Sequence, residues 1–207
     1  MQRGTAIFLA ALSASAAMSL PASAVTLATA TTSLNIRSGP GPQFPVIGAI
    51  PTKGQATVTG CIEGSLWCQV TFNGKQGWAY SQYMMAGPGT QVVAVNQLRG
   101  VPVIQYSAPA ATVGTAGAPP AINGDFVAPV ADAAPLSIAP PPATVQTYVV
   151  QHPVTPVYLN GEVVEGAGLP QDVVLTPVPN YDYNYAYVNG VPVLVEPTSR
   201  RVTYIYR

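Results

Sequence analysis

The stretch Leu34-Asn-Ile-Arg-Ser-Gly-Pro-Gly41 opens the part of the chain that decides its fold. From Leu34 to Arg37 apolar and polar residues alternate, which is the pattern of a half-buried β-strand. Ser38 to Pro42 then carries Gly or Pro at four consecutive positions, and such a segment forms a loop and not a helix. The stretch therefore predicts a strand followed by a loop with special backbone angles.

Short strands separated by tight turns continue from this point as far as Met84. Asn73-Gly74 is the preferred residue pair of a type I′ turn, so the strands on either side of it are expected to form a hairpin. The remaining apolar runs are equally short, and none has the period of a helix. The predicted strands are Leu34–Arg37, Val46–Ile50, Ala56–Cys61, Leu66–Phe72 and Lys75–Tyr80. Five short strands without a helix predict a small β-barrel.

Residues 33–85 resemble the bacterial SH3-like (SH3b) domain. The residues that carry the resemblance are Leu34 to Gly41, Gly48 to Gly54, Trp67 to Val70, Gly77 to Tyr80, and Tyr83-Met84. The resemblance implies an open barrel of five to six strands, often found in envelope or wall-directed proteins. In some members the ligand is peptidoglycan or its peptides.

Aromatic residues in this segment are the candidates for ligand binding. Trp78, Tyr80 and Tyr83 are predicted to line a groove for an extended peptide, as aromatic residues do in SH3 domains, and Arg37 is expected to add polar contacts. The alternative is that the aromatic side chains form the core of a very small barrel, and this alternative is favoured for Trp67.

The two cysteines, Cys61 and Cys68, are predicted to form a disulfide, because an even pair in an exported protein is most simply a disulfide. A metal pair and a catalytic thiol are the alternatives. Two thiolates without further ligands make a poor zinc site, and the one histidine, His152, is distant in sequence. We expect neither metal nor cofactor.

The first 24 residues have the pattern of a signal peptide. Arg3 precedes a run of small and apolar residues from Ala6 to Leu20, and Ala22-Ser-Ala24 is a cleavage site. A membrane anchor is the alternative, but the run is short and contains serines. We therefore expect a periplasmic or secreted protein without stable membrane insertion. Removal of Arg3 leaves 7 basic against 8 acidic residues without a basic patch, which argues against nucleic acid as a partner.

The domain boundaries follow from composition. We expect the barrel at residues 25–86, an extension and linker at 87–147, and a C-terminal β domain at 148–207. Between Ser107 and Thr147, Ala and Pro supply 20 of 41 residues, so this segment is predicted to be a disordered spacer. A proline-rich ligand for another domain is the alternative. No convincing amphipathic helix is expected after residue 24.

The C-terminal block is expected to contain a small antiparallel sheet. With Asn189-Gly190 as a two-residue turn, Val188 pairs with Val191 and Ala186 with Val193. A third strand is expected from Arg201 to Tyr206. Tyr158 to Glu165 also contains an Asn-Gly pair and reads as another hairpin. The valines of the sheet are the expected core face.

The opposite, outer face of the same hairpin carries a ladder formed by Tyr183, Tyr185 and Tyr187, and the sequence leaves open whether this face is exposed. Flat rings with hydroxyl groups on an exposed face suit the stacking of peptide or sugar, so this ladder is a second candidate platform. The alternative is that the rings pack under the linker or the barrel. Residues 157–207 also resemble domain-of-unknown-function family 1236 of bacterial envelope proteins, a family without an assigned activity.

We infer a mainly β, non-enzymatic binding or adaptor protein of the envelope that recognises cell-wall peptide or an envelope protein. No catalytic residue is predicted, because paired carboxylates, a Ser/His/Asp arrangement and a phosphate loop are all missing from the sequence. The alternative is a structural envelope protein without a specific small ligand.

Overall fold

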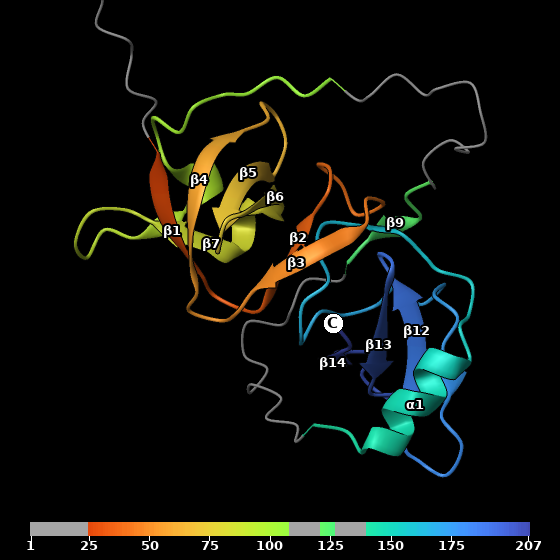
Figure 1. Ribbon diagram of the computed structural model, residues 1–207. Helices are drawn as coiled ribbons and strands as arrows, with labels where there is room; N and C mark the ends of the chain where they lie inside the picture. Colours follow the sequence, from red (N-terminus) through yellow and green to blue (C-terminus); the bar gives the residue numbers. More distant parts are fainter. Residues whose placement is uncertain (1–24, 108–120, 127–139) are drawn as a thin grey trace, which may run out of the picture.

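The structure is a computed structural model that describes residues 25–107, 121–126 and 140–207. It contains a barrel near the N-terminus and a smaller sheet near the C-terminus (Figure 1). The predicted signal peptide and much of the predicted linker lie outside the described residues.

The elements of the first part are β1 (Thr26–Ala30), β2 (Leu34–Arg37), β3 (Val46–Ile50), β4 (Gln55–Cys61), β5 (Trp67–Phe72), β6 (Lys75–Tyr80), a 3-10 helix (Ser81–Tyr83), β7 (Met84–Ala86), β8 (Val93–Ala94) and a second 3-10 helix (Val95–Gln97). The remaining elements are β9 (Gly124–Asp125), α1 (Ala143–Gln151), β10 (Leu159–Asn160), β11 (Thr176–Pro177), β12 (Asn184–Val188), β13 (Val191–Val195) and β14 (Val202–Ile205).

The barrel strands lie in the order β3-β2-β6-β5-β4-β1-β7-β8. All five predicted strands are present, with small differences at their ends. Asn73 and Gly74 both have positive φ, 48° and 76°, as the predicted turn requires. β1 and β7 extend the sheet beyond the predicted strands. The predicted barrel is therefore confirmed.

The two tryptophans belong to the packed part of the barrel. Trp67 is 5% exposed and Trp78 is 6% exposed, and both join the cluster that includes Leu34 and Val70. The ring of Trp78 meets Tyr106 edge-on at 5.4 Å, so the chain after the barrel folds back over this ring. For Trp67 the favoured core alternative is confirmed.

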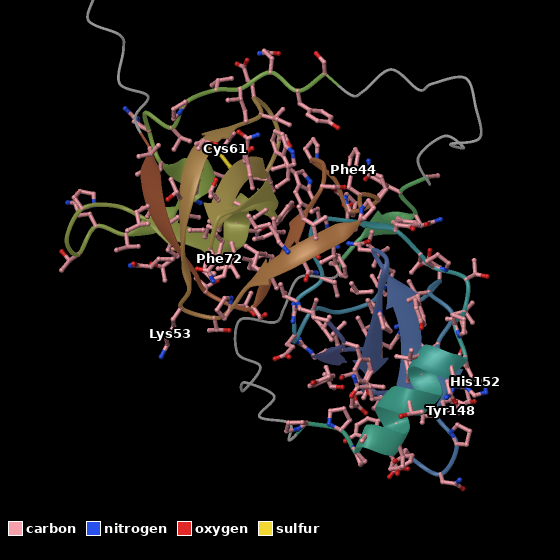
Figure 2. All side chains as sticks on the ribbon, in the orientation of Figure 1. Phe44, Lys53, Cys61, Phe72, Tyr148 and His152 are labelled. Atoms are coloured by element: carbon pink, nitrogen blue, oxygen red, sulfur yellow. A yellow bond between two sulfur atoms is a disulfide. The ribbon has the colours of Figure 1, made fainter. Side chains whose placement is uncertain are left out.

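The disulfide between Cys61 and Cys68 is confirmed. A bulge in β4 between Val58 and Gly60 brings the two cysteines directly opposite each other on neighbouring strands, with Cα atoms 4.0 Å apart. The sulfur at Cys61 is visible in Figure 2 between the strands of the barrel. The bond closes the turn that connects β4 to β5.

The C-terminal sheet has the order β11-β12-β13-β14, and its hairpin has the predicted register. Val188 pairs with Val191 and Ala186 with Val193, and the third strand follows as expected. The valine face is buried against an irregular segment that includes Val163 and Leu169.

Helix α1 covers the tyrosine face of this sheet, so the expectation that no amphipathic helix follows residue 24 was wrong, and of the two alternatives for the tyrosines the packed one applies. The helix was not predicted, because its nine residues bury only one short stripe, Val145 and Val149, which is too little for a recognisable period. The tyrosine face is covered and not exposed: Tyr185 is 1% exposed, and its hydroxyl donates to the His152 carbonyl (2.8 Å). The Tyr187 hydroxyl likewise donates to the Val149 carbonyl (3.1 Å). Figure 2 shows the helix with Tyr148 and His152 labelled.

The hairpin expected around Asn160-Gly161 is also absent. β10 pairs in parallel with β9, which lies within the segment predicted to be a spacer. Gly161 then turns with φ at 104° and directs the chain toward the barrel. Helix α1 also begins within the predicted spacer, at Ala143, whereas 108–120 and 127–139 lie outside the described residues.

The barrel and the C-terminal block are joined by a buried ion pair between Arg37 of β2 and Glu162. Both side chains are 0% exposed. The Arg37 Nε–H donates to Glu162 Oε2 (2.6 Å), and an Nη2–H donates to Oε1 (2.8 Å). Two parallel hydrogen bonds between a guanidinium and a carboxylate are the strongest arrangement that this pair of groups can make.

The other polar atoms of the pair are also satisfied, which a buried ion pair requires. Arg37 Nη1 donates to the carbonyls of Pro42, Phe44 and Asn189. Glu162 Oε1 additionally accepts from the Asn35 side chain (3.0 Å). The acceptors around this one guanidinium come from the Gly/Pro loop of the barrel, from the segment after β10 and from the tip of the C-terminal hairpin.

Asn189 has two structural roles: it forms part of the hairpin turn, and it takes part in the contact between the barrel and the C-terminal block. It takes the positive φ of the hairpin turn, 52°, and its side chain bonds the Leu159 amide and the Gly161 carbonyl. Its own carbonyl accepts from Arg37. At the end of the chain, Arg207 donates to the Asn35 side chain (2.8 Å), which closes the network.

This contact explains why all four residues of β2 are buried. Leu34 and Ile36 point into the barrel, as the alternation predicts, and Asn35 and Arg37 lie under the C-terminal block. The expected half-buried strand is therefore buried on both faces. Figure 1 shows β2 and β3 on the side of the barrel that faces β12 and β13.

Replacing both Cys61 and Cys68 by serine is expected to lower the free energy of unfolding by about 2–3 kcal/mol, because the bond closes a short loop in the unfolded chain. Urea unfolding followed by tryptophan fluorescence measures the loss. A double variant as stable as the oxidised wild type contradicts the expectation.

Replacing Glu162 by leucine is expected to lower the free energy of unfolding by about 3–5 kcal/mol, because it leaves the Arg37 guanidinium buried and unpaired. In the double variant Arg37→Met/Glu162→Leu, the loss should be smaller than the sum of the two single losses by at least about 1 kcal/mol. Arg99→Met, at an exposed arginine, is the control and should cost less than about 0.5 kcal/mol. Additive losses at Arg37 and Glu162 contradict the coupling.

Candidate functional site

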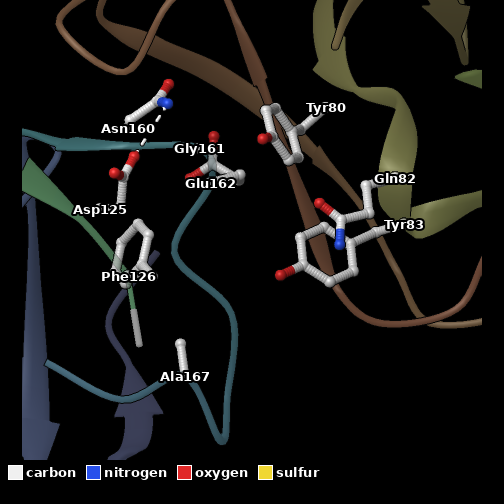
Figure 3. A pocket seen from close by; sticks show the side chains of 9 residues that line it. All are labelled: Tyr80, Gln82, Tyr83, Asp125, Phe126, Asn160, Gly161, Glu162 and Ala167. Atoms are coloured by element: carbon white, nitrogen blue, oxygen red, sulfur yellow. Dashed lines mark hydrogen bonds between the residues drawn. The ribbon is translucent and has the colours of Figure 1, made fainter. Parts of the chain in front are cut away.

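A recess lies where the barrel meets the C-terminal block (Figure 3). One wall is formed by Tyr80 and Tyr83 of the barrel. The opposite side carries Asp125 and Phe126, and buried residues form the floor. The full set of lining residues is Tyr80, Gln82, Tyr83, Asp125, Phe126, Asn160, Gly161, Glu162 and Ala167. Both parts of the chain are therefore needed to form it.

The positions of the two tyrosines follow from the end of β6. Tyr80 is the last residue of that strand and pairs with Trp67 of β5, whose ring it meets edge-on at 5.4 Å. The 3-10 helix that follows turns the chain and places Tyr83 next to Tyr80, with ring centroids 6.0 Å apart. Trp67 thus positions the ring of Tyr80, and the 3-10 helix positions the ring of Tyr83.

Gly161 keeps the floor of the recess open. A Cβ atom on this residue would lie 3.5 Å from the Tyr80 hydroxyl oxygen and 3.7 Å from a ring carbon of Phe126. Any side chain here would therefore fill the space between the two rings. The positive φ of Gly161 also disfavours other residues.

The two carboxylates at the recess differ in their surroundings. Glu162 is neutralised by Arg37. Asp125 is exposed and accepts one hydrogen bond from the Asn160 side-chain amide (3.0 Å), which orients it. Among the described residues, Arg37–Glu162 is the one ion pair within 4.0 Å, so Asp125 has no cationic partner there. Of the two carboxylates that line the recess, Asp125 is therefore the one without an ion-pair partner.

Burial raises the pKa of the Tyr80 hydroxyl, with smaller contributions from Tyr83 and from the negative charge of Asp125. Burial likewise raises the pKa of Tyr83, and Glu162 adds to the effect. Both hydroxyls are therefore protonated at neutral pH. They offer a ligand O–H donors and flat aromatic faces.

A second depression adjoins the first and shares the lining residues Tyr80 and Asn160 with it. Its other lining residues are Gly64, Ser65, Leu66 and Trp67. The two cavities measure about 190 and 290 Å³. Together they form a surface feature of the size that holds a small ligand or a few residues of a peptide.

The predicted site residues are only partly brought together. Tyr80 and Tyr83 lie side by side in the recess. Trp78 is buried beneath Tyr106 and does not line it. Arg37 is buried in the contact between the two parts, and its donors are occupied by protein acceptors, so contact with a ligand would require that interface to open.

The predicted second platform does not form an exposed ladder. The Tyr187 hydroxyl donates to the Val149 carbonyl of α1, the Tyr185 hydroxyl donates to the carbonyl of His152 directly after it, and Tyr183 packs in the same cluster. Tyr181, which extends the ladder, is 39% exposed and contacts Thr144 of the helix through its hydroxyl (2.8 Å).

Sequence reasoning missed Asp125, Phe126, Asn160 and Glu162. One signal was available for Glu162: it is a carboxylate directly before Val163-Val164, in a chain with few charges. Asp125 and Phe126 stand in an Ala/Pro-rich segment whose composition indicates a spacer, so composition pointed away from them.

The described ranges contain no group of three or more His, Cys, Asp or Glu side chains arranged to hold a metal ion. Within the same ranges, no helix is long and apolar enough to cross a membrane.

Two families match the chain. Residues 32–85 match the family described as bacterial SH3 domain, and residues 148–207 match the family described as domain of unknown function (DUF1236). Neither a curated protein nor a solved structure matches the chain. The chain thus joins a bacterial SH3 domain to a domain of unknown function, and the recess lies where the two meet.

Proposed function

We propose that this is an exported, non-enzymatic binding protein of the bacterial envelope that uses the recess to hold a peptide of the cell wall. The observation that carries the proposal is the recess itself, in which two tyrosine rings of the bacterial SH3 domain face polar groups of the other part of the chain. Flat rings beside hydrogen-bonding groups suit the backbone and side chains of a short peptide.

The shape of the site supports a peptide over a compact small molecule. The recess and its neighbouring depression lie on either side of Tyr80 and Asn160, with Phe126 lining the first and Trp67 and Ser65 lining the second. An elongated ligand can contact both, whereas a compact one fills a single cavity. Peptide binding of this kind requires complementary contacts and no reacting group.

Location in the envelope is supported by the disulfide and by the predicted signal peptide. Disulfides persist in oxidising compartments such as the periplasm. The Cys61–Cys68 bond and the A-x-A cleavage pattern before Val25 are independent features, and both favour export.

The proposal predicts that protein purified after export is retained on purified peptidoglycan, and that Tyr83→Ala reduces the retained fraction about tenfold. Removing this half-buried ring deletes one wall of the recess, and tenfold corresponds to about 1.4 kcal/mol. Sedimentation with insoluble peptidoglycan measures retention.

The matched control is Tyr181→Ala, which removes an exposed tyrosine far from the recess and should leave retention unchanged. In both variants, tryptophan fluorescence checks that the barrel is folded, and the amide signal of Val193 checks that the C-terminal sheet is folded. If wild type is not retained, or if Tyr83→Ala is retained equally well, the proposal is wrong, and a structural envelope protein without a specific ligand becomes the better account.

A further inference from the structure

The recess between the two parts of the chain has a charge that selects for one kind of ligand group. We propose that it binds a primary ammonium group carried on a short alkyl chain, with the Asp125 carboxylate as its counter-ion and the rings of Tyr83 and Tyr80 beside it. This inference rests on the proposed function, because it names the part of the peptide that the site recognises.

Asp125 has a carboxylate oxygen that is free to bind a ligand. Its Oδ1 accepts from the Asn160 side chain, which holds Asp125 at the mouth of the recess, and among the described residues no Lys, Arg or His forms an ion pair with it. Its second oxygen thus stays available to a ligand. A hydrogen bond between an ammonium and a carboxylate is about twice as strong as a bond between neutral groups.

Glu162, the other carboxylate of the recess, differs from Asp125 because it already has a cationic partner. Both carboxylates belong to the recess, but Arg37 satisfies Glu162 by two hydrogen bonds. A ligand cation therefore meets the charge of Asp125 and not an already paired carboxylate. The same buried pair fixes the floor next to Gly161, so the site does not need to rearrange when a cation enters.

One wall of the recess is aromatic. Tyr80 and Tyr83 lie 6.0 Å apart with their planes tilted by 40°, and Phe126 lies across the recess from them (Figure 3). Aromatic faces attract cations, most strongly where water is excluded. The alkyl part of the ligand can pack on the same rings. A carboxylate or phosphate group, by contrast, would be repelled by Asp125.

The volume of the recess suits a compact cationic group. The recess of about 190 Å³ has room for an ammonium and a few methylene groups, and the depression beyond Tyr80 and Asn160 has room for more of the ligand. Guanidinium is planar and has a wider head, whereas an ammonium is compact and donates in three directions. The dimensions therefore favour an amine.

The test uses 1,5-diaminopentane as the probe and 1,5-pentanediol as its uncharged analogue of similar length. Amide signals of Gly161 and Tyr83 in two-dimensional nuclear magnetic resonance spectra follow binding to the exported protein. We expect the diamine to shift these signals saturably and the diol to bind at least tenfold more weakly. Equal shifts with both probes, or no shift with the diamine, overturn the inference.

Asp125→Asn removes the charge and keeps the shape of the side chain. We expect it to weaken diamine binding at least tenfold. Asp182→Asn, the same substitution at another exposed aspartate, is the matched control and should bind like wild type. An Asp125→Asn variant that binds the diamine as tightly as wild type also overturns the inference.

Peptidoglycan separates this inference from the proposed function and identifies the source of the amine. Acetylation of the free amines of purified peptidoglycan should abolish retention of the protein. If acetylated peptidoglycan still retains the protein through Tyr83, the proposed function stands and the ammonium inference is wrong. If native peptidoglycan is never retained but the diamine binds at Asp125, the inference stands and the proposed source is wrong.

Discussion

The ion pair between Arg37 and Glu162 is the contact on which the rest of the structure depends. Two charges that are fully withdrawn from water are tolerated only when every hydrogen-bonding group around them is satisfied. Here that condition is met by atoms from the loop after β2, from the segment after β10 and from the tip of the C-terminal hairpin. Because these atoms are distant in sequence, the pair is complete only when the two parts of the chain are docked.

The docking gives β2 a second role, because its residues contribute to both the barrel core and the contact with the C-terminal block. Leu34 and Ile36 fill the barrel core, and the intervening Asn35 and Arg37 hold the C-terminal block. The recess depends on the same contact. Glu162 fixes the segment that carries Asn160 and Gly161, and this segment meets Tyr80 only in the docked arrangement. The recess is therefore complete only when the two parts are docked.

Much of the fold follows from local sequence. The barrel strands, the turn at Asn73-Gly74 and the register of the hairpin around Asn189 were all predicted, because alternation and Asn-Gly turns act over a few residues. The helix over Ala143–Gln151 was not predicted, because what stabilises it is the tyrosine face of a distant sheet and not a pattern of its own. The same reason explains why the cover over the tyrosine ladder was not predicted. Alternation assigns residues to the two faces of a sheet, but it does not show which distant segment packs on each face.

The candidate site could be predicted only on its barrel side. Tyr80 and Tyr83 stand out as aromatic residues at the end of a strand, and the structure places them in the recess. Arg37 also stands out as a charge beside a Gly/Pro loop. An arginine that binds a ligand and an arginine that pairs with a distant carboxylate look the same in the sequence. Here the carboxylate belongs to Glu162, which lies 125 residues further on. Asp125 is hidden for a related reason, since its partner Asn160 comes from a different segment.

The most direct test of the account follows the unfolding of the barrel and of the C-terminal block separately in one experiment. Both tryptophans, Trp67 and Trp78, lie in the barrel, so their fluorescence reports on that part alone, and the amide signal of Val193 reports on the C-terminal sheet. The account predicts that the two signals are lost at the same urea concentration, because the buried ion pair makes the two parts one cooperative unit. Loss of the Val193 signal at a clearly lower urea concentration than the fluorescence change would contradict it.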